Sequence, residues 1–176
     1  VPSKDVPSDG IVSGGTTADS NATKFPAFTG KDLDGNDVSS DKLFSGNAFT
    51  VVNFWFTTCK PCVGELGDLD ALHKDVAGKG GAVVGINAFT LGGDAAAIAD
   101  AKDVLTKSGA TYQNVYFDAD SEAGKFTENV YAYPTTYVVD RNGNIVGDPI
   151  VGAITSDGHM ETLQALIDTA LANDKG

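Results

Sequence analysis

Two cysteines, Cys59 and Cys62, are the residues whose type and spacing predict a definite chemistry. They are the only cysteines of the 176-residue chain, and a random pair would stand three positions apart roughly 1% of the time. Such a pair can be a redox dithiol, a structural disulfide or half of a zinc site. A disulfide closing so short a loop gains little chain entropy. A zinc site needs further ligands, and the two histidines, His73 and His159, are far apart in the sequence. The spacing therefore favours a redox-active pair.

The elements around the cysteines must hold this pair at a particular place. Residues 49–56 form an almost unbroken apolar run, which is typical of a strand buried on both faces. Thr57 or Thr58 can cap a following helix, and Pro61 falls in its first turn, where a missing N–H does no harm. Apolar residues then recur at helical spacing as far as Val76. We therefore expect the cysteines where a central strand gives way to a single helix.

The start of a helix suits thiol–disulfide exchange. Its first turn presents unpaired N–H groups and the positive end of the helix dipole, which stabilise a thiolate. Lys60 adds a neighbouring cation. We expect Cys59 to be the exposed nucleophile and Cys62, one turn further on, to be the buried resolving thiol that releases the mixed disulfide.

The rest of the chain alternates between strand and helix patterns, with no internal repeat. We expect a hairpin over 25–39, strands at 82–89, 114–118 and 136–140, and helices at 93–107, 121–129 and 156–172. Asn142 and Gly143 predict a further hairpin turn into a last short strand. Alternating strands and helices indicate an α/β sheet with helices on both faces.

Composition limits the functions open to the chain. Twelve Lys and Arg against 24 Asp and Glu give a formal charge of −12, which argues against nucleic-acid binding. Residues 1–23 are polar and lack an apolar period, so we expect a flexible leader or tether followed by one domain over 24–176. No apolar run reaches the roughly 18 residues needed to cross a bilayer.

Residues 51–66, VVNFWFTTCKPCVGEL, resemble the active-site segment of thioredoxin-like proteins. They are most similar to the extracytoplasmic TlpA/ResA-type thiol–disulfide oxidoreductases. Residues 130–140 resemble the segment around that family's cis-proline, and residues 25–35 resemble its N-terminal hairpin. The resemblance implies a thioredoxin-like fold: a central mixed sheet flanked by helices, with an N-terminal β-hairpin and a strand–helix insertion within 90–128.

The resemblance also implies roles for individual residues. Glu65 corresponds to a functional Glu of the TlpA/ResA type, and we expect it to exchange protons beside Cys59 and Cys62, because Asn53 replaces the buried Asp of cytoplasmic thioredoxins. A cis bond before Pro134 is expected on the same ground. The expected substrate-binding residues are Lys60, Pro61, Tyr133, Pro134 and Thr135.

The implied protein is an extracytoplasmic protein-disulfide reductase of a bacterial cell envelope. It would be membrane-tethered, or secreted through a removed N-terminal signal. Its partners would be client proteins with disulfides and a membrane-bound or thioredoxin-type electron donor. We expect a monomer that needs no cofactor or metal and binds no nucleic acid.

Three alternatives remain open at the level of sequence. The same site could serve a disulfide oxidase or isomerase, or the Cys-x-x-Cys pair could hold a metal in a chaperone. A peroxiredoxin-like peroxidase is disfavoured, because its loop needs Pro and Thr where this chain has Val52 and Phe56. The chain also departs from the TlpA/ResA type at Thr58, where Trp is usual, which predicts a less aromatic surface beside Cys59.

Overall fold

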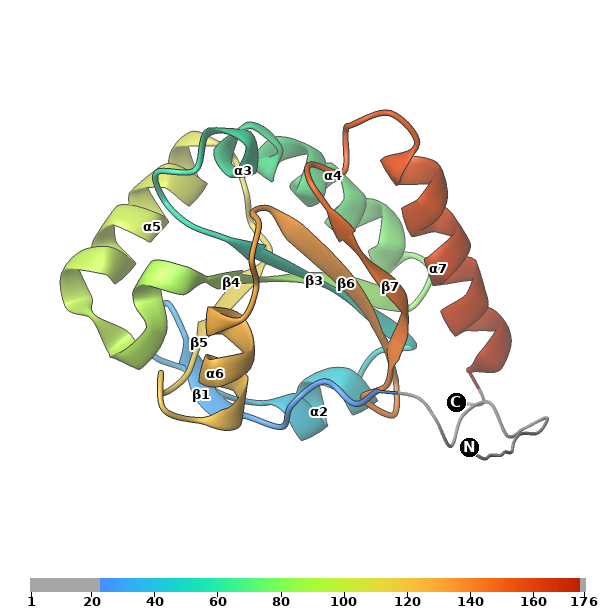
Figure 1. The fold of residues 1–176 in the computed structure, drawn as a ribbon, viewed down its shortest axis with the longest axis horizontal. Coiled ribbons are helices and arrows are strands. Elements are labelled where there is room, and N and C mark those ends of the chain that lie inside the picture. The colour runs from blue at the N-terminus through green and yellow to red at the C-terminus, as the bar shows by residue number, and fades with distance from the viewer. Residues whose placement is uncertain (1–22, 175–176) are drawn as a thin grey trace.

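The structure, a computed structural model, describes residues 23–174, and the fold within this range is a mixed sheet between two layers of helices (Figure 1). The strands are β1 (Thr29–Asp32), β2 (Asp37–Ser39), β3 (Phe49–Trp55), β4 (Gly81–Asn87), β5 (Gln113–Tyr116), β6 (Thr135–Asp140) and β7 (Ile145–Val151). The helices are α2 (Ser40–Ser45), α3 (Lys60–Gly64), α4 (Leu66–Ala77), η1 (Ala88–Gly93), α5 (Ala95–Lys107), α6 (Glu122–Glu128) and α7 (His159–Asn173). This arrangement confirms the predicted thioredoxin-like fold class.

The seven strands lie in the order β2-β1-β5-β4-β3-β6-β7. The central strands β3, β4 and β5 run parallel, as expected where helices connect them, and β6 and β7 close one side of the sheet in antiparallel fashion. The N-terminal hairpin of β1 and β2 joins the other side by antiparallel pairing with β5. The sheet therefore places β3, which leads into the cysteine pair, between two long partner strands.

Every residue of β3 is buried, as its apolar run predicts. Successive side chains alternate between the two faces of the sheet. Val51 and Trp55 enter a core with α4, α5 and α7, whereas Val52 and Phe54 enter a second core with α2 and α6. Asn53 shares the face of Val51 and Trp55, so its amide points toward the helices that follow the cysteines.

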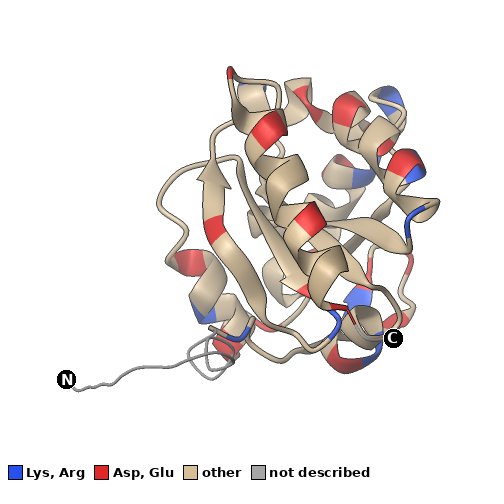
Figure 2. Ribbon diagram, turned by 90° about the vertical axis from the view of Figure 1, so that its right-hand side faces the viewer, with Lys and Arg blue, Asp and Glu red and all other residues tan. Residues whose placement is uncertain are grey.

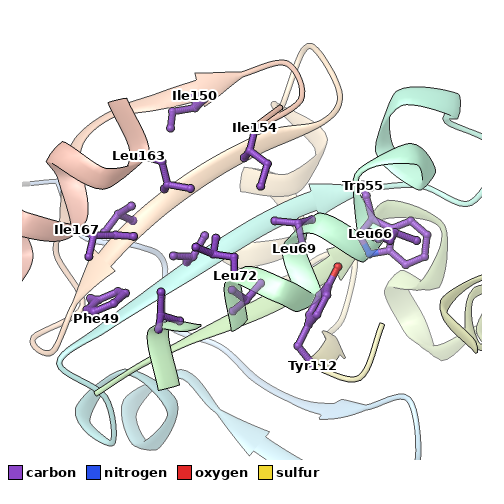
Figure 3. Close-up of a cluster of buried hydrophobic side chains, with 14 of the residues drawn as sticks. Phe49, Trp55, Leu66, Leu69, Leu72, Tyr112, Ile150, Ile154, Leu163 and Ile167 are labelled. Carbon is purple, nitrogen blue, oxygen red and sulfur yellow. The ribbon is translucent and has the colours of Figure 1, made fainter. Parts of the chain in front are cut away.

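The core on the α4 and α7 side is dense and mostly aliphatic (Figure 3). Trp55 is fully buried within it, and its indole N–H donates to Asn114 Oδ1 at 2.8 Å. Tyr112 points its hydroxyl into the same core, and that oxygen has no hydrogen-bond partner among the described residues. Burial is the main cause that raises the pKa of Tyr112, and the charge of Glu65 adds to it.

Two predicted elements are wrong in detail. The helix expected after Thr58 is two helices, because the chain turns at Glu65 between the end of α3 and the start of α4. The strand expected over 82–89 ends at Asn87, whose side chain caps the following η1 by accepting from the Phe89 N–H at 2.8 Å. At Asn87 a side-chain cap interrupts what the apolar pattern alone would continue, whereas at Glu65 the backbone turns without a side-chain cap.

Acidic residues are spread over helices and loops in the view of Figure 2. Among residues 23–174, no helix is long and apolar enough to cross a membrane. The leader predicted over 1–23 lies, apart from Thr23, outside the described residues.

Candidate active site

Cys59 and Cys62 are joined by a disulfide at the point where β3 gives way to α3. Cys59 itself occupies the N-cap position, and its sulfur accepts the backbone N–H of Cys62 at 3.3 Å. The predicted cap by Thr57 or Thr58 is therefore wrong. Thr57 instead accepts a hydrogen bond from the Asn87 side chain at 3.0 Å, which ties the loop to the end of β4.

The disulfide is more enclosed than the sequence suggests. Cys59 is 6% exposed and Cys62 is fully buried, so the expected order of exposure holds, but Cys59 is not an exposed residue in this state. Lys60 and Pro61 are exposed on the first turn of α3. In this oxidised state the exposed residues next to the disulfide are therefore Lys60 and Pro61 rather than Cys59 itself.

Glu65 lies at the junction of α3 and α4 and is 1% exposed. Both carboxylate oxygens are hydrogen-bonded: Asn53 Nδ2 donates to Oε2 at 3.0 Å, and Ile154 N–H donates to Oε1 at 2.8 Å. Burial raises the pKa of Glu65, and the two hydrogen bonds oppose the rise only in part. The site therefore holds a carboxylate able to take up a proton more readily than an ordinary Glu.

Asn53 joins Glu65 to the neighbouring strand. Its Nδ2 also donates to Thr136 Oγ1 of β6 at 3.1 Å, while its Oδ1 has no partner within the described part of the chain. An amide does not titrate near neutral pH, so Glu65 is the titratable member of this buried network.

The segment entering β6 lies beside the loop that carries the cysteines. Thr135 pairs with Phe54 in the sheet register, which brings Pro134 opposite the end of β3. The Tyr133–Pro134 peptide bond is cis. Pro134 and Thr135 are buried, and the Thr135 hydroxyl donates to Ala132 O at 2.7 Å. The Thr135 side chain is therefore engaged within the protein, and Tyr133, which is half-buried, is more accessible than Pro134 or Thr135.

Sequence reasoning missed an aromatic row formed by Phe89, Phe56 and Tyr133. The ring centre of Phe56 lies 5.1 Å from that of Phe89 and 5.2 Å from that of Tyr133. Phe89 is 49% exposed. Aromatic rings from η1 and from the segment before β6 thus flank Phe56, in the loop that leads from β3 to Cys59. The apolar pattern placed Phe89 inside a strand, so no sequence signal marked it as exposed.

Residues 23–174 contain no group of three or more His, Cys, Asp or Glu side chains arranged to hold a metal ion. His73 is half-buried and accepts the Val83 N–H at 3.0 Å, which gives it a structural partner. His159 is also half-buried and hydrogen-bonds to Ala153 O at 2.7 Å.

Comparison with known proteins gives matches along most of the chain. The model of the AhpC/TSA family matches residues 22–147. The thioredoxin-like protein YneN of Bacillus subtilis is 33% identical over 132 residues, which cover 74% of this chain and 71% of that protein. The thiol-disulfide oxidoreductase ResA of Bacillus anthracis is 25% identical over 135 residues, covering 75% and 70%.

Solved structures agree with the fold. A putative thiol:disulfide interchange protein DsbE from Chlorobium tepidum superposes with a TM-score of 0.68 and 26% identity, covering 85% of this chain and 96% of that one. A putative thioredoxin from Neisseria meningitidis gives a TM-score of 0.66 and 28% identity, covering 87% and 93%.

Proposed function

The chain belongs to the AhpC/TSA family, and on that premise we propose that it is a thiol–disulfide oxidoreductase that reduces disulfides of client proteins. The observation that carries the proposal is the Cys59–Cys62 disulfide at the start of α3, with a buried carboxylate, Glu65, one turn beyond it. The ResA protein and the putative thiol:disulfide interchange protein to which the chain is similar support the same activity.

The cycle starts from the reduced protein. The Cys59 thiolate attacks one sulfur of a client disulfide, forms a mixed disulfide and releases the other client sulfur as a thiolate. Cys62 then loses its proton and attacks the Cys59 sulfur. This attack re-forms the Cys59–Cys62 disulfide and releases the second client thiolate, so two electrons pass to the client.

Protein groups assist at both thiols. The Cys62 N–H points at the Cys59 sulfur, where it would stabilise the attacking thiolate. Glu65 accepts the proton that Cys62 loses. Its raised pKa suits it to this step, because a base works best when its pKa lies near the working pH.

Clients bind along the surface formed by Lys60, Pro61 and Tyr133, and the buried Pro134 and Thr135 fix the backbone of the segment that carries Tyr133. The aromatic row extends this surface on the side of Tyr133, so we propose that preferred clients carry apolar residues near the reacting cystine. The backbone of Tyr133, which precedes β6, offers an extended client segment a place to pair as a short added strand.

We place this activity in the envelope of a bacterial cell, outside the cytoplasm. A reductase at this location needs another protein to supply its electrons. The source would be a membrane-bound or thioredoxin-type donor. The resemblance to TlpA/ResA-type proteins supports this location, as does the tendency of disulfides to persist in oxidising compartments. We propose that the protein acts as a monomer, because Cys59, Cys62 and Glu65 all belong to one chain.

Insulin reduction with a dithiol as electron source tests the function. Wild type should turn over many times, Cys59→Ser should be inactive, and Cys62→Ser should stop as a mixed disulfide detectable by mass spectrometry. Full multiple-turnover activity of Cys62→Ser would rule out the two-thiol cycle, and peroxide turnover faster than insulin reduction would assign a peroxidase instead.

The reduction potential decides the direction of electron flow. A Cys59–Cys62 potential near or below about −250 mV in a glutathione or dithiothreitol buffer supports a reductase, whereas about −120 mV would indicate an oxidase.

A further inference from the structure

One peptide group connects Glu65 with His159. The N–H of Ile154 donates to Glu65 Oε1 at 2.8 Å, and the carbonyl of the same peptide, that of Ala153, lies 2.7 Å from His159 Nδ1. A carbonyl oxygen only accepts hydrogen bonds, so Nδ1 carries the proton and donates it. The imidazole and the carboxylate are therefore hydrogen-bonded to the C=O and the N–H of the same peptide group.

Two glycines, Gly152 and Gly158, allow the His159 ring to take its position. Gly152 has a φ of +104°, and a Cβ at this position would approach His159 Cε1 to 3.2 Å. Gly158, at the N-cap of α7 with a φ of +81°, sets the ring at the first residue of the helix. Gly152 also donates its N–H to Pro134 O at 2.8 Å, so the loop after β7 contacts the segment entering β6 as well.

We propose that His159 is a positioning residue that controls the Glu65 carboxylate through the peptide group between Ala153 and Ile154. The inference rests on the proposed role of Glu65 as the proton acceptor of the cycle. His159 touches neither client nor thiol in this arrangement. It fixes the loop after β7 so that the Ile154 N–H stays aimed at Glu65, and it polarises that N–H through the carbonyl.

The electrostatics of the site support this arrangement. Burial is the largest influence on the pKa of Glu65 and raises it, and Asp68 on α4 raises it further. The Ile154 N–H, Asn53 and His159 all lower it. Tyr112 faces the same carboxylate from the segment before β5, with its own pKa raised. Removing His159 would therefore take away one of the influences that lower the pKa of Glu65, and this pKa should rise.

The test is the pH dependence of thiol alkylation in the reduced protein, with His159→Leu, His159→Asn and Glu65→Gln compared with wild type. The wild-type profile should contain an inflection that Glu65→Gln abolishes. His159→Leu should move that inflection up by about half a pH unit, a roughly threefold fall in the ratio of ionised to protonated Glu65 at a given pH. His159→Asn keeps a neutral donor near the Nδ1 position and should recover at least half of the shift.

A double-mutant cycle separates this effect from general damage. In the Glu65→Gln background, His159→Leu should shift nothing further. His73→Leu is the matched control, because His73 is also half-buried and bonded to backbone, but its partner is the Val83 N–H and not the peptide that binds Glu65, so it should leave the inflection in place. If His159→Leu does not fold, His159→Gln replaces it, since Gln moves the donor away from the Nδ1 position.

The inference is overturned if the inflection stays in place without His159, if His159→Asn behaves like His159→Leu, or if the shift persists in the Glu65→Gln background. These outcomes are distinct from failure of the proposed function, which would appear as a wild-type protein that reduces no disulfide.

Discussion

Asn53→Asp would place a second carboxylate against Glu65, and the structure allows its cost to be worked out. Asn53 Nδ2 lies 3.0 Å from Glu65 Oε2, and the two residues are 0% and 1% exposed. Two ionised carboxylates at that separation would repel by about 5 kcal/mol, even at an effective dielectric constant of about 20. Binding one proton at pH 7 costs about 4 kcal/mol instead, because an ordinary Asp has a pKa of about 3.9 and each unit is about 1.4 kcal/mol. Because binding a proton costs less than the repulsion between two charges, the two carboxylates should share one proton.

Urea unfolding of the oxidised proteins between pH 5 and 8 measures this cost. Asn53→Asp should lose about 3–4 kcal/mol of unfolding free energy at pH 7, since the raised pKa of Glu65 reduces the cost of the shared proton. The folded variant holds one more proton than its unfolded chain. Its deficit relative to wild type should therefore grow with rising pH, by about 1.4 kcal/mol per unit at most.

The double variant Asn53→Asp/Glu65→Gln is the control, because it moves the carboxylate from the helix junction to the strand and leaves only one acid. It should recover most of the lost stability. A deficit of Asn53→Asp below about 1 kcal/mol at pH 7, unchanged at pH 5, would refute the reasoning that these two buried groups are in contact.

Three further variants test other parts of the molecule. Hydrogen bonds to Asp70 outweigh its burial and lower its pKa to about 2, so Asp70→Asn should cost about 1–3 kcal/mol in urea unfolding at pH 7. The difference should shrink as the pH falls from about 3.8 towards 2, where the wild-type carboxylate becomes protonated. Gly85→Ala drives a Cβ into the Asn114 side chain and should cost about 1–3 kcal/mol in thermal unfolding; an unchanged Tm would contradict the packing described. Phe89→Ser should raise KM severalfold for an apolar client but leave small-disulfide reduction and Tm unchanged; equal losses on both substrates would remove the aromatic row from client binding.

Local sequence patterns were enough to predict the redox pair and its immediate setting. The run before Cys59 is buried along all of β3, and a helix starts directly after this cysteine. Both features depend on neighbouring residues: an apolar β-branched run suits a central strand, and Pro61 suits a first helical turn. The alternation of strands and helices likewise predicted the α/β fold, in which α4 and α5 each connect two parallel strands.

Element boundaries set by local turns and caps were harder to predict. The apolar spacing after Cys62 continues through Glu65 without a visible break, yet the chain turns there and begins α4 at Leu66. Phe89 continues the apolar pattern of β4, but the Asn87 side chain starts η1 and leaves the ring half-exposed. In both places a local conformational choice outweighed the periodicity.

The sequence by itself determined that a Cys-x-x-Cys pair would sit at the end of a buried strand, because strand and helix signals are carried by adjacent residues. Only the tertiary structure decided what surrounds that pair. The Ile154 N–H that binds Glu65 comes from 89 positions further along the chain, and His159 reaches the same peptide from the start of α7. A buried carboxylate is defined by the donors that satisfy it, and here those donors are brought together by sheet register and helix packing, which no local pattern in the sequence records.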